Sequence, residues 1–139
     1  MKVANAIWYV VSVLVSVLAG AYVADRIHRR RENINNKKEE YRELLSTLTQ
    51  ASNKIADFHG PDDGHSPAEE RAYYEVKEKA LIVIDNRLFI TSEMEKMDLR
   101  SRWISAVHDV ENGGHSILFR QTVRQILRQI TSAAKHLIE

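Results

Sequence analysis

The residues best suited to chemistry lie in one short loop, which has the sequence His59-Gly-Pro-Asp-Asp-Gly-His65. Two imidazoles and two carboxylates within seven residues are ligand types that bind Zn²⁺ and other transition metals. The Gly and Pro residues between them predict a flexible turn, and ordering such a turn around an ion costs conformational free energy. An exposed acidic turn explains the same composition, so we expect no metal site here.

A second pair, His108-Asp109, is of the kind that ligates metal in HD-type phosphohydrolases. That pattern requires a later aspartate, and no Asp follows position 109. The chain also lacks the Glu-x-x-His pair of di-iron bundles, a glycine-rich phosphate loop and a Gly-x-Ser-x-Gly elbow. Cysteine is absent, which excludes thiolate metal sites and a cysteine nucleophile. We therefore expect neither catalytic residues nor a bound cofactor, and no small-molecule substrate is evident.

The elements that would position any functional residue begin with an apolar stretch. Residues 3–24 carry no formal charge, and ten of these 22 residues are Val, Leu or Ile. A helix of this length spans about 33 Å, enough to cross a hydrocarbon core about 30 Å thick. The sequence therefore predicts a transmembrane anchor over residues 1–25. A cleaved signal peptide is the alternative, because Ala19-Gly20-Ala21 is an acceptable cleavage site.

The charges that flank this stretch favour an uncleaved anchor and set its orientation. Only Lys2 and the terminal amine precede it, whereas four arginines follow it: Arg26, Arg29, Arg30 and Arg31. Positive charge after an apolar segment holds that flank in the cytoplasm. We expect a single-pass protein of the inner or plasma membrane with a cytoplasmic C-terminal domain. The four arginines are predicted to lie at lipid headgroups; an ordinary positive-inside flank without lipid specificity is the alternative.

Small residues recur every four positions along the anchor, at Ser12, Ser16, Gly20 and Ala24. Such a stripe lets two helix backbones approach closely in a bilayer. It predicts a helix–helix contact, either between copies of this chain or with another membrane protein. The alternative is that Ser, Gly and Ala are simply common in membrane helices.

The rest of the chain has few helix breakers. Apart from Gly20, its Gly and Pro residues fall within 60–67 and at 113–114, which favours long helices over strands. We predict an all-α chain in which the anchor continues into a basic juxtamembrane and amphipathic helix over residues 26–58. A loop follows over 59–66. Residues 67–139, completed by the helix over 26–58, form a small antiparallel cytoplasmic bundle of about four helices.

Heptad spacing is clear only in the second half of the helix predicted over 26–58. Tyr41, Leu48 and Ile55 are seven residues apart, and Leu44 and Ala51 fill the accompanying positions. This spacing is typical of a coiled coil, but three heptads are few. A stalk that dimerises and a helix that packs into its own domain both fit the pattern, and we favour the second.

Two capping boxes mark later helix starts. Ser66-Pro67-Ala68-Glu69 combines the capping Ser and Glu with Pro at the first helical position. Ser92 and Glu95 have the same spacing and predict a further helix that ends at Gly113 or Gly114. Residues 81–91 could instead form a hairpin, but the turn at Asp85-Asn86 lacks glycine, so we expect helix there.

The last predicted helix, from about Ile117, has the clearest apolar pattern. Its predicted core face comprises Phe119, Val123, Ile126, Leu127, Ile130, Ala134 and Leu137, and its other side carries the cations Arg120, Arg124, Arg128 and Lys135. These cations form a candidate partner face. Pairing with acidic neighbours is the simpler explanation, because residues 43–112 have a net charge of −6. Nucleic acid is not favoured as a partner, because this face has no aromatic residue to stack on bases.

The sequence therefore predicts a membrane-anchored helical interaction or scaffold protein, for example the small subunit of a membrane complex. Its expected partners are membrane lipid and either another protein or further copies of itself. The main alternative is a self-associating membrane effector or sensor in stress or defence. A membrane-tethered nucleic-acid binder is a weaker alternative.

Overall fold

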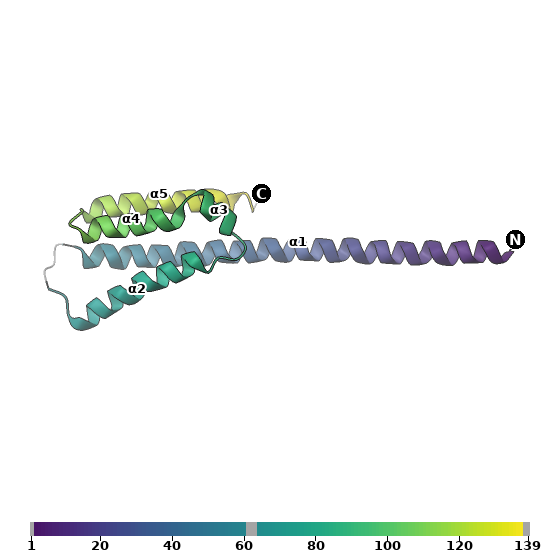
Figure 1. Ribbon diagram of the computed structural model, residues 1–139, viewed down its shortest axis with the longest axis horizontal. Helices are drawn as coiled ribbons and strands as arrows, with labels where there is room; N and C mark the ends of the chain where they lie inside the picture. The colour runs from purple at the N-terminus through teal and green to yellow at the C-terminus, as the bar shows by residue number, and fades with distance from the viewer. Residues whose placement is uncertain (1, 61–63, 138–139) are drawn as a thin grey trace. The chain divides into compact units, whose positions relative to one another are not determined.

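The computed structural model describes residues 2–60 and 64–137, which form helices without any strand (Figure 1). The helices are α1 (Lys2–Phe58), α2 (Pro67–Asp85), α3 (Thr91–Lys96), α4 (Leu99–Glu111) and α5 (Ser116–Lys135). The prediction of an all-α chain is confirmed for these residues. The chain divides into two compact units, Met1–Asn35 and Asn36–Glu139, which are described separately. This division lies inside the predicted helix over 26–58.

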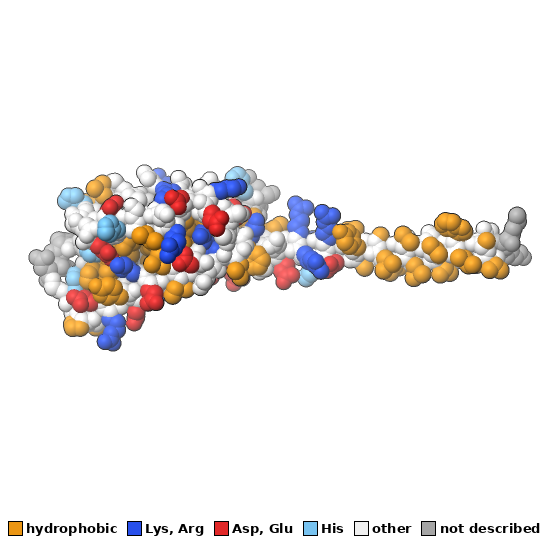
Figure 2. Space-filling view, in the orientation of Figure 1, with side chains coloured by type: hydrophobic (Ala, Val, Ile, Leu, Met, Phe, Trp, Pro, Cys, Tyr) orange, Lys and Arg blue, Asp and Glu red, His pale blue; other side chains and the backbone are white. Residues whose placement is uncertain are grey.

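The first unit is the N-terminal part of α1, and its apolar side chains from Val3 to Ile27 are exposed on all sides of the helix. Figure 2 shows apolar side chains along this part of the helix. Their exposed fractions run from 44% at Val11 to 74% at Trp8. None of the residues in its most apolar stretch is buried. Among the described residues, α1 is the one helix that is long and apolar enough to cross a membrane.

The second unit has a core to which α1 contributes one face. Tyr41, Leu44, Leu48, Ala51 and Ile55 are all buried there. These are the residues of the heptad pattern, and they belong to one cluster with buried residues of the other four helices. Within the described chain, the heptad face is therefore covered by the same chain's own helices.

Helices α4 and α5 lie side by side along this part of α1, while α2 crosses it obliquely (Figure 1). Trp103 of α4 is 1% exposed, and its ring meets the edge of Phe119 of α5 at a centroid distance of 6.3 Å. The turn between the two helices passes through Gly113, whose φ of 94° favours glycine. A Cβ added to Gly114 would lie 2.6 Å from the carbonyl oxygen of Asp109, so this turn requires glycine at both positions.

The predicted start of α2 is found in the structure, although only half of its capping box forms. Ser66 is the N-cap, and its hydroxyl accepts a hydrogen bond from the Glu69 amide at 3.2 Å. The Glu69 carboxylate contacts His65 instead of the cap amide. Helix α2 ends at Asp85, and residues 81–84 are helical, so no hairpin forms there. The prediction of helix through residues 86–90 is wrong, because Leu88 is 81% exposed in the turn that follows α2.

The single helix predicted from Ser92 to Gly113 is also wrong, because the chain breaks into α3 and α4. Asp98, at the break, has a φ of 52°, a left-handed conformation that Asp tolerates better than most residues. In an unbroken helix Met94 and Leu99 would point about 140° apart. The break allows both to enter the core, where they are 0% and 2% exposed.

The capping box predicted at Ser92 does not form. Ser92 lies inside α3 and its hydroxyl bonds to Glu93, while Thr91 bonds to the carbonyl of Arg87. The backbone amides of the turn before α3 find their hydrogen-bond acceptor in a residue distant in sequence. The Glu40 carboxylate accepts hydrogen bonds from the amides of Leu88 at 2.9 Å, Phe89 at 2.9 Å and Ile90 at 3.1 Å. Glu40 thus links α1 to the α2–α3 turn.

We expect Glu40→Ala to lower the free energy of unfolding by about 1–3 kcal/mol, because the amide of the buried Ile90 loses its charged partner. Thermal unfolding of the full chain in mild detergent, followed by circular dichroism, measures this. Glu39→Ala is the matched control, since Glu39 is exposed next to Glu40. Equal destabilisation by the two substitutions would show that the amide contacts contribute nothing specific.

Candidate functional site

The small-residue stripe of the apolar segment is uncovered in the structure. Ser12, Ser16, Gly20 and Ala24 are all exposed. The Ser16 hydroxyl donates to the Ser12 carbonyl at 2.9 Å, so it is satisfied within its own helix. A Cβ added at Gly20 would meet no atom within 4 Å. The structure therefore places no side chain of the described residues against this stripe.

The four arginines after the apolar segment are also exposed: Arg26, Arg29, Arg30 and Arg31. Arg29 forms an ion pair with Asp25, one turn earlier, at 3.2 Å. An exposed pair of this kind contributes little to stability, so it does not hold the arginines in one arrangement. The predicted role of these residues at lipid headgroups stays a prediction.

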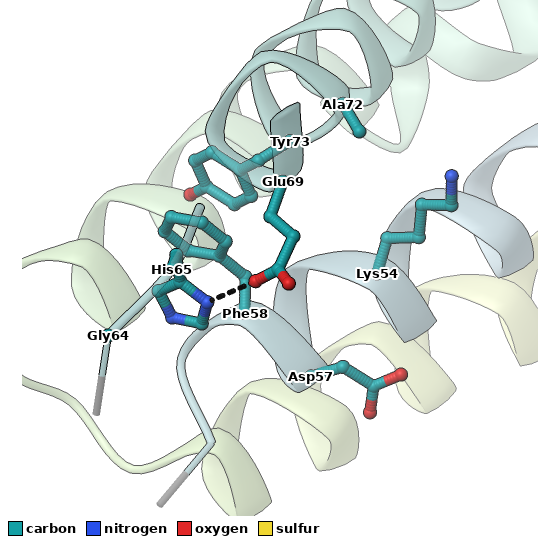
Figure 3. A pocket seen from close by; sticks show the side chains of 8 residues that line it. All are labelled: Lys54, Asp57, Phe58, Gly64, His65, Glu69, Ala72 and Tyr73. Atoms are coloured by element: carbon teal, nitrogen blue, oxygen red, sulfur yellow. Dashed lines mark hydrogen bonds and ion pairs between the residues drawn. The ribbon is translucent and has the colours of Figure 1, made fainter. Parts of the chain in front are cut away.

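Figure 3 shows Gly64 and His65 of the loop with metal-ligand residues, together with Phe58, Glu69 and Tyr73. Asp62 and Asp63 of that loop lie outside the described residues. The ring of Phe58 stacks on His65 at 4.0 Å between centroids, and on Tyr73 at 4.2 Å. His65 also bonds to the Glu69 carboxylate at 3.0 Å. Among the described residues, no group of three or more His, Asp or Glu side chains could hold a metal ion.

A hydrogen-bonded network links the end of α1 to α2 and α4. Nε2 of His59 lies 3.0 Å from the hydroxyl of Tyr73, which donates to the carboxylate of Glu111 at 2.6 Å. Lys77 bonds to the same carboxylate. These residues are far apart in the sequence, and their spacing gave no signal of the network. It joins three helices at the end of the core where the loop lies.

The network shifts the pKa values of Tyr73, Glu111 and His59, each in a definite direction. Burial raises the pKa of Tyr73, and the Glu111 carboxylate raises it further. Burial would raise the pKa of Glu111, but the hydrogen bonds from Lys77 and Tyr73 outweigh it, and the net pKa is lowered. Burial lowers the pKa of His59, with His65 and Lys77 acting in the same direction and Glu111 opposing them.

The His59 shift predicts a loss of stability on acidification. Because the pKa of His59 in the folded chain lies below its ordinary 6.5, the unfolded chain binds the proton more readily. The stabilisation is present above pH 6.5 and is lost as the pH falls through the folded-state pKa. His59→Gln should therefore flatten the fall of the thermal midpoint between about pH 7 and pH 5.

The control for this experiment is His115→Gln, because exposed His115 lies outside the network. It should keep the pH dependence of the parent chain. If His59→Gln kept that dependence as well, protonation of another group would control acid stability.

His108 and Asp109 are both exposed on α4. The His108 ring bonds to the Asn112 amide nitrogen at 2.8 Å, within the last turn of its own helix. The backbone carbonyl of Asp109 accepts from the Gly114 amide at 2.9 Å. The described contacts of this pair are thus local ones at the end of the helix.

The predicted cationic face of α5 divides into two parts. Arg120 forms an ion pair with Asp57 of α1 at 3.1 Å, which is the pairing with an acidic neighbour that the charge distribution favours. The other three cations, Arg124, Arg128 and Lys135, are exposed. They line a shallow groove together with Leu127, Thr131 and Ser132. We call these three cations and Leu127, Thr131 and Ser132 the α5 groove.

Comparison of the chain with protein-family models, with curated proteins and with solved structures finds no match. The functional argument therefore starts from two features of this molecule. One is the exposed apolar segment of α1, and the other is the set of surfaces presented by the second unit.

Proposed function

We propose that the chain is a single-pass membrane protein whose second unit serves as an interaction or scaffold module at the membrane, for example as the small subunit of a complex. The observation that carries this proposal is the apolar segment of α1, which is exposed on every side. Its ten Val, Leu and Ile residues favour insertion by about 3–6 kcal/mol. A bilayer is the environment that buries such a surface all round.

The arginines support a cytoplasmic second unit. A cleaved signal sequence meets the same test of length and hydropathy as an anchor. Four arginines within six residues after the segment oppose its transfer across the membrane, so we favour an anchor with its C-terminal side in the cytoplasm.

The scaffold role is supported by the way α1 takes part in the second unit. Leu44, Leu48 and Ile55 are fully buried in its core, so we propose that α1, α2, α4 and α5 act as a small antiparallel bundle. A partner bound to that bundle is held at the membrane by the same helix that enters its core. Exposed Ile117 and Leu118, at the start of α5, offer apolar contacts to such a partner.

We expect the full chain with a C-terminal tag to stay in the membrane fraction after alkaline carbonate extraction. A chain lacking residues 1–31 should be soluble and mostly helical, because the core residues lie beyond that cut. Mass spectrometry should find the original N-terminus. Release of the full chain by carbonate, or a mature N-terminus at Tyr22, would contradict the anchor.

A self-associating membrane effector or sensor is the second candidate, favoured by the open face at Gly20. If the small-residue stripe mediates assembly, Gly20→Leu should weaken the helix contact and leave insertion intact, since Leu is itself favourable in a bilayer. Crosslinking in membranes, or a membrane two-hybrid signal, measures the contact. Leu14→Ala is the control outside the stripe. An unchanged signal in Gly20→Leu would assign assembly to the second unit.

A further inference from the structure

The α5 groove is built on one stripe of an amphipathic helix. The opposite face of α5 buries Phe119, Val123, Ile126 and Ile130. On the exposed face, positions 124, 128, 131 and 135 follow one another at intervals of four, three and four residues, so they share one side of the helix. Because the other face of α5 is held in the core, this side of the helix faces outward.

The donors that the groove offers are mainly cationic. The Thr131 hydroxyl donates to the Leu127 carbonyl at 2.8 Å and is therefore engaged in its own helix. The groove therefore favours an anionic ligand, because its charged donors are the guanidinium groups of Arg124 and Arg128 and the ammonium group of Lys135. Arginine binds phosphate in a two-pronged geometry, which makes phosphate the anion that fits best.

The positive charge of the groove is not offset within its own helix. Residues 116–135 contain no Asp or Glu, and none of the salt bridges among the described residues involves Arg124, Arg128 or Lys135. Arg120, whose charge is offset by Asp57, lies outside the groove. Each uncompensated cation strengthens attraction to an anionic membrane surface on the order of five-fold.

Among phosphate sources, a membrane surface fits these residues better than nucleic acid. The side chains of the groove include the apolar Leu127 and no aromatic residue. An aliphatic residue among cations is typical of helices that lie at a bilayer interface, whereas single-stranded nucleic acid is bound through aromatic stacking. The chemistry of the groove therefore favours lipid phosphate.

The length of the chain keeps the groove near the bilayer if the apolar segment is inserted. Eleven residues lie between Ala24 and Asn36, and even if the chain between these two residues were fully extended it would span only about 40 Å. Within the second unit, the last turn of α5 lies at the same end as α3 (Figure 1), and Glu93 of α3 pairs with Lys37 at 3.2 Å. Lys135 is thus at the end of the unit where the chain enters it.

We propose that the α5 groove, through Arg124, Arg128 and Lys135, binds the phosphate groups of anionic phospholipids in the membrane that anchors the chain. This inference rests on the proposed anchoring. It gives the second unit a docked state, in which the cations of the α5 groove contact lipid headgroups.

The test uses the full chain in nanodiscs of phosphatidylcholine, alone or mixed with phosphatidylglycerol. The chain has no cysteine, so Gln121→Cys gives a single site for a fluorescent dye on the exposed side of α5. A quencher attached to lipid headgroups then reports contact. We expect strong quenching with phosphatidylglycerol, weak quenching with phosphatidylcholine alone, and loss of the difference at high salt.

The triple variant Arg124→Gln, Arg128→Gln, Lys135→Gln should reduce the docked population on the order of 100-fold, and quenching should fall to the phosphatidylcholine level. The matched control, Lys54→Gln, Arg71→Gln, Lys79→Gln, removes the same charge from exposed positions on α1 and α2 and should keep the quenching. The double variant Arg124→Lys, Arg128→Lys retains the positive charge and should keep most of the quenching. Equal helix content by circular dichroism confirms that the variants are folded.

Equal quenching in both lipid mixtures, or equal loss in the two triple variants, would overturn the docking proposal while leaving the anchor intact. Tighter Arg124-dependent binding of an oligonucleotide or an acidic peptide than of phosphatidylglycerol would also overturn it. If the chain failed to enter nanodiscs at all, the proposed anchoring itself would be wrong.

Discussion

The second unit depends on one apolar face of α1, from Tyr41 to Ile55. Leu44, Leu48 and Ile55 on this face are 0% exposed, and burying such a side chain contributes about 1.5–3 kcal/mol. Buried residues of α2, α3, α4 and α5 meet this face in one cluster. Because α1 contributes the first layer of that cluster, the later helices bury their apolar sides only when its face is present.

Apolar residues are distributed differently around the two ends of α1. Between Val3 and Ala24 apolar residues occur on all sides of the helix, and none is buried by the described chain. From Tyr41 onward they are confined to one face, which the chain itself covers. Between them lie Arg26 to Arg31, whose charges suit neither a hydrocarbon interior nor a protein core. The change in pattern marks where the surroundings of the helix change.

Periodicity within one helix was enough to predict the apolar segment, the heptad face and the core side of α5, since Phe119, Val123, Ile126 and Ile130 are all buried. The local cap at Ser66 was predictable for the same reason. The break at Asp98 was not, because it depends on where Met94 and Leu99 meet the core. Glu40 and the network of His59, Tyr73 and Glu111 act between segments far apart in sequence. The pairing of Arg120 with Asp57 separated it from Arg124 and Arg128, which sequence spacing alone had grouped together.

The contact of Glu40 with the α2–α3 turn makes that turn sensitive to rotation of α1 about its own axis. Three amides converge on one carboxylate, so the angular position of α1 about its own axis is fixed relative to the turn. Advancing the helix by a single residue would swing the carboxylate through about 100° and carry it away from all three donors. Twisting of α1 inside the unit is therefore opposed at its entry, because such a twist would leave the amide of the buried Ile90 without its acceptor.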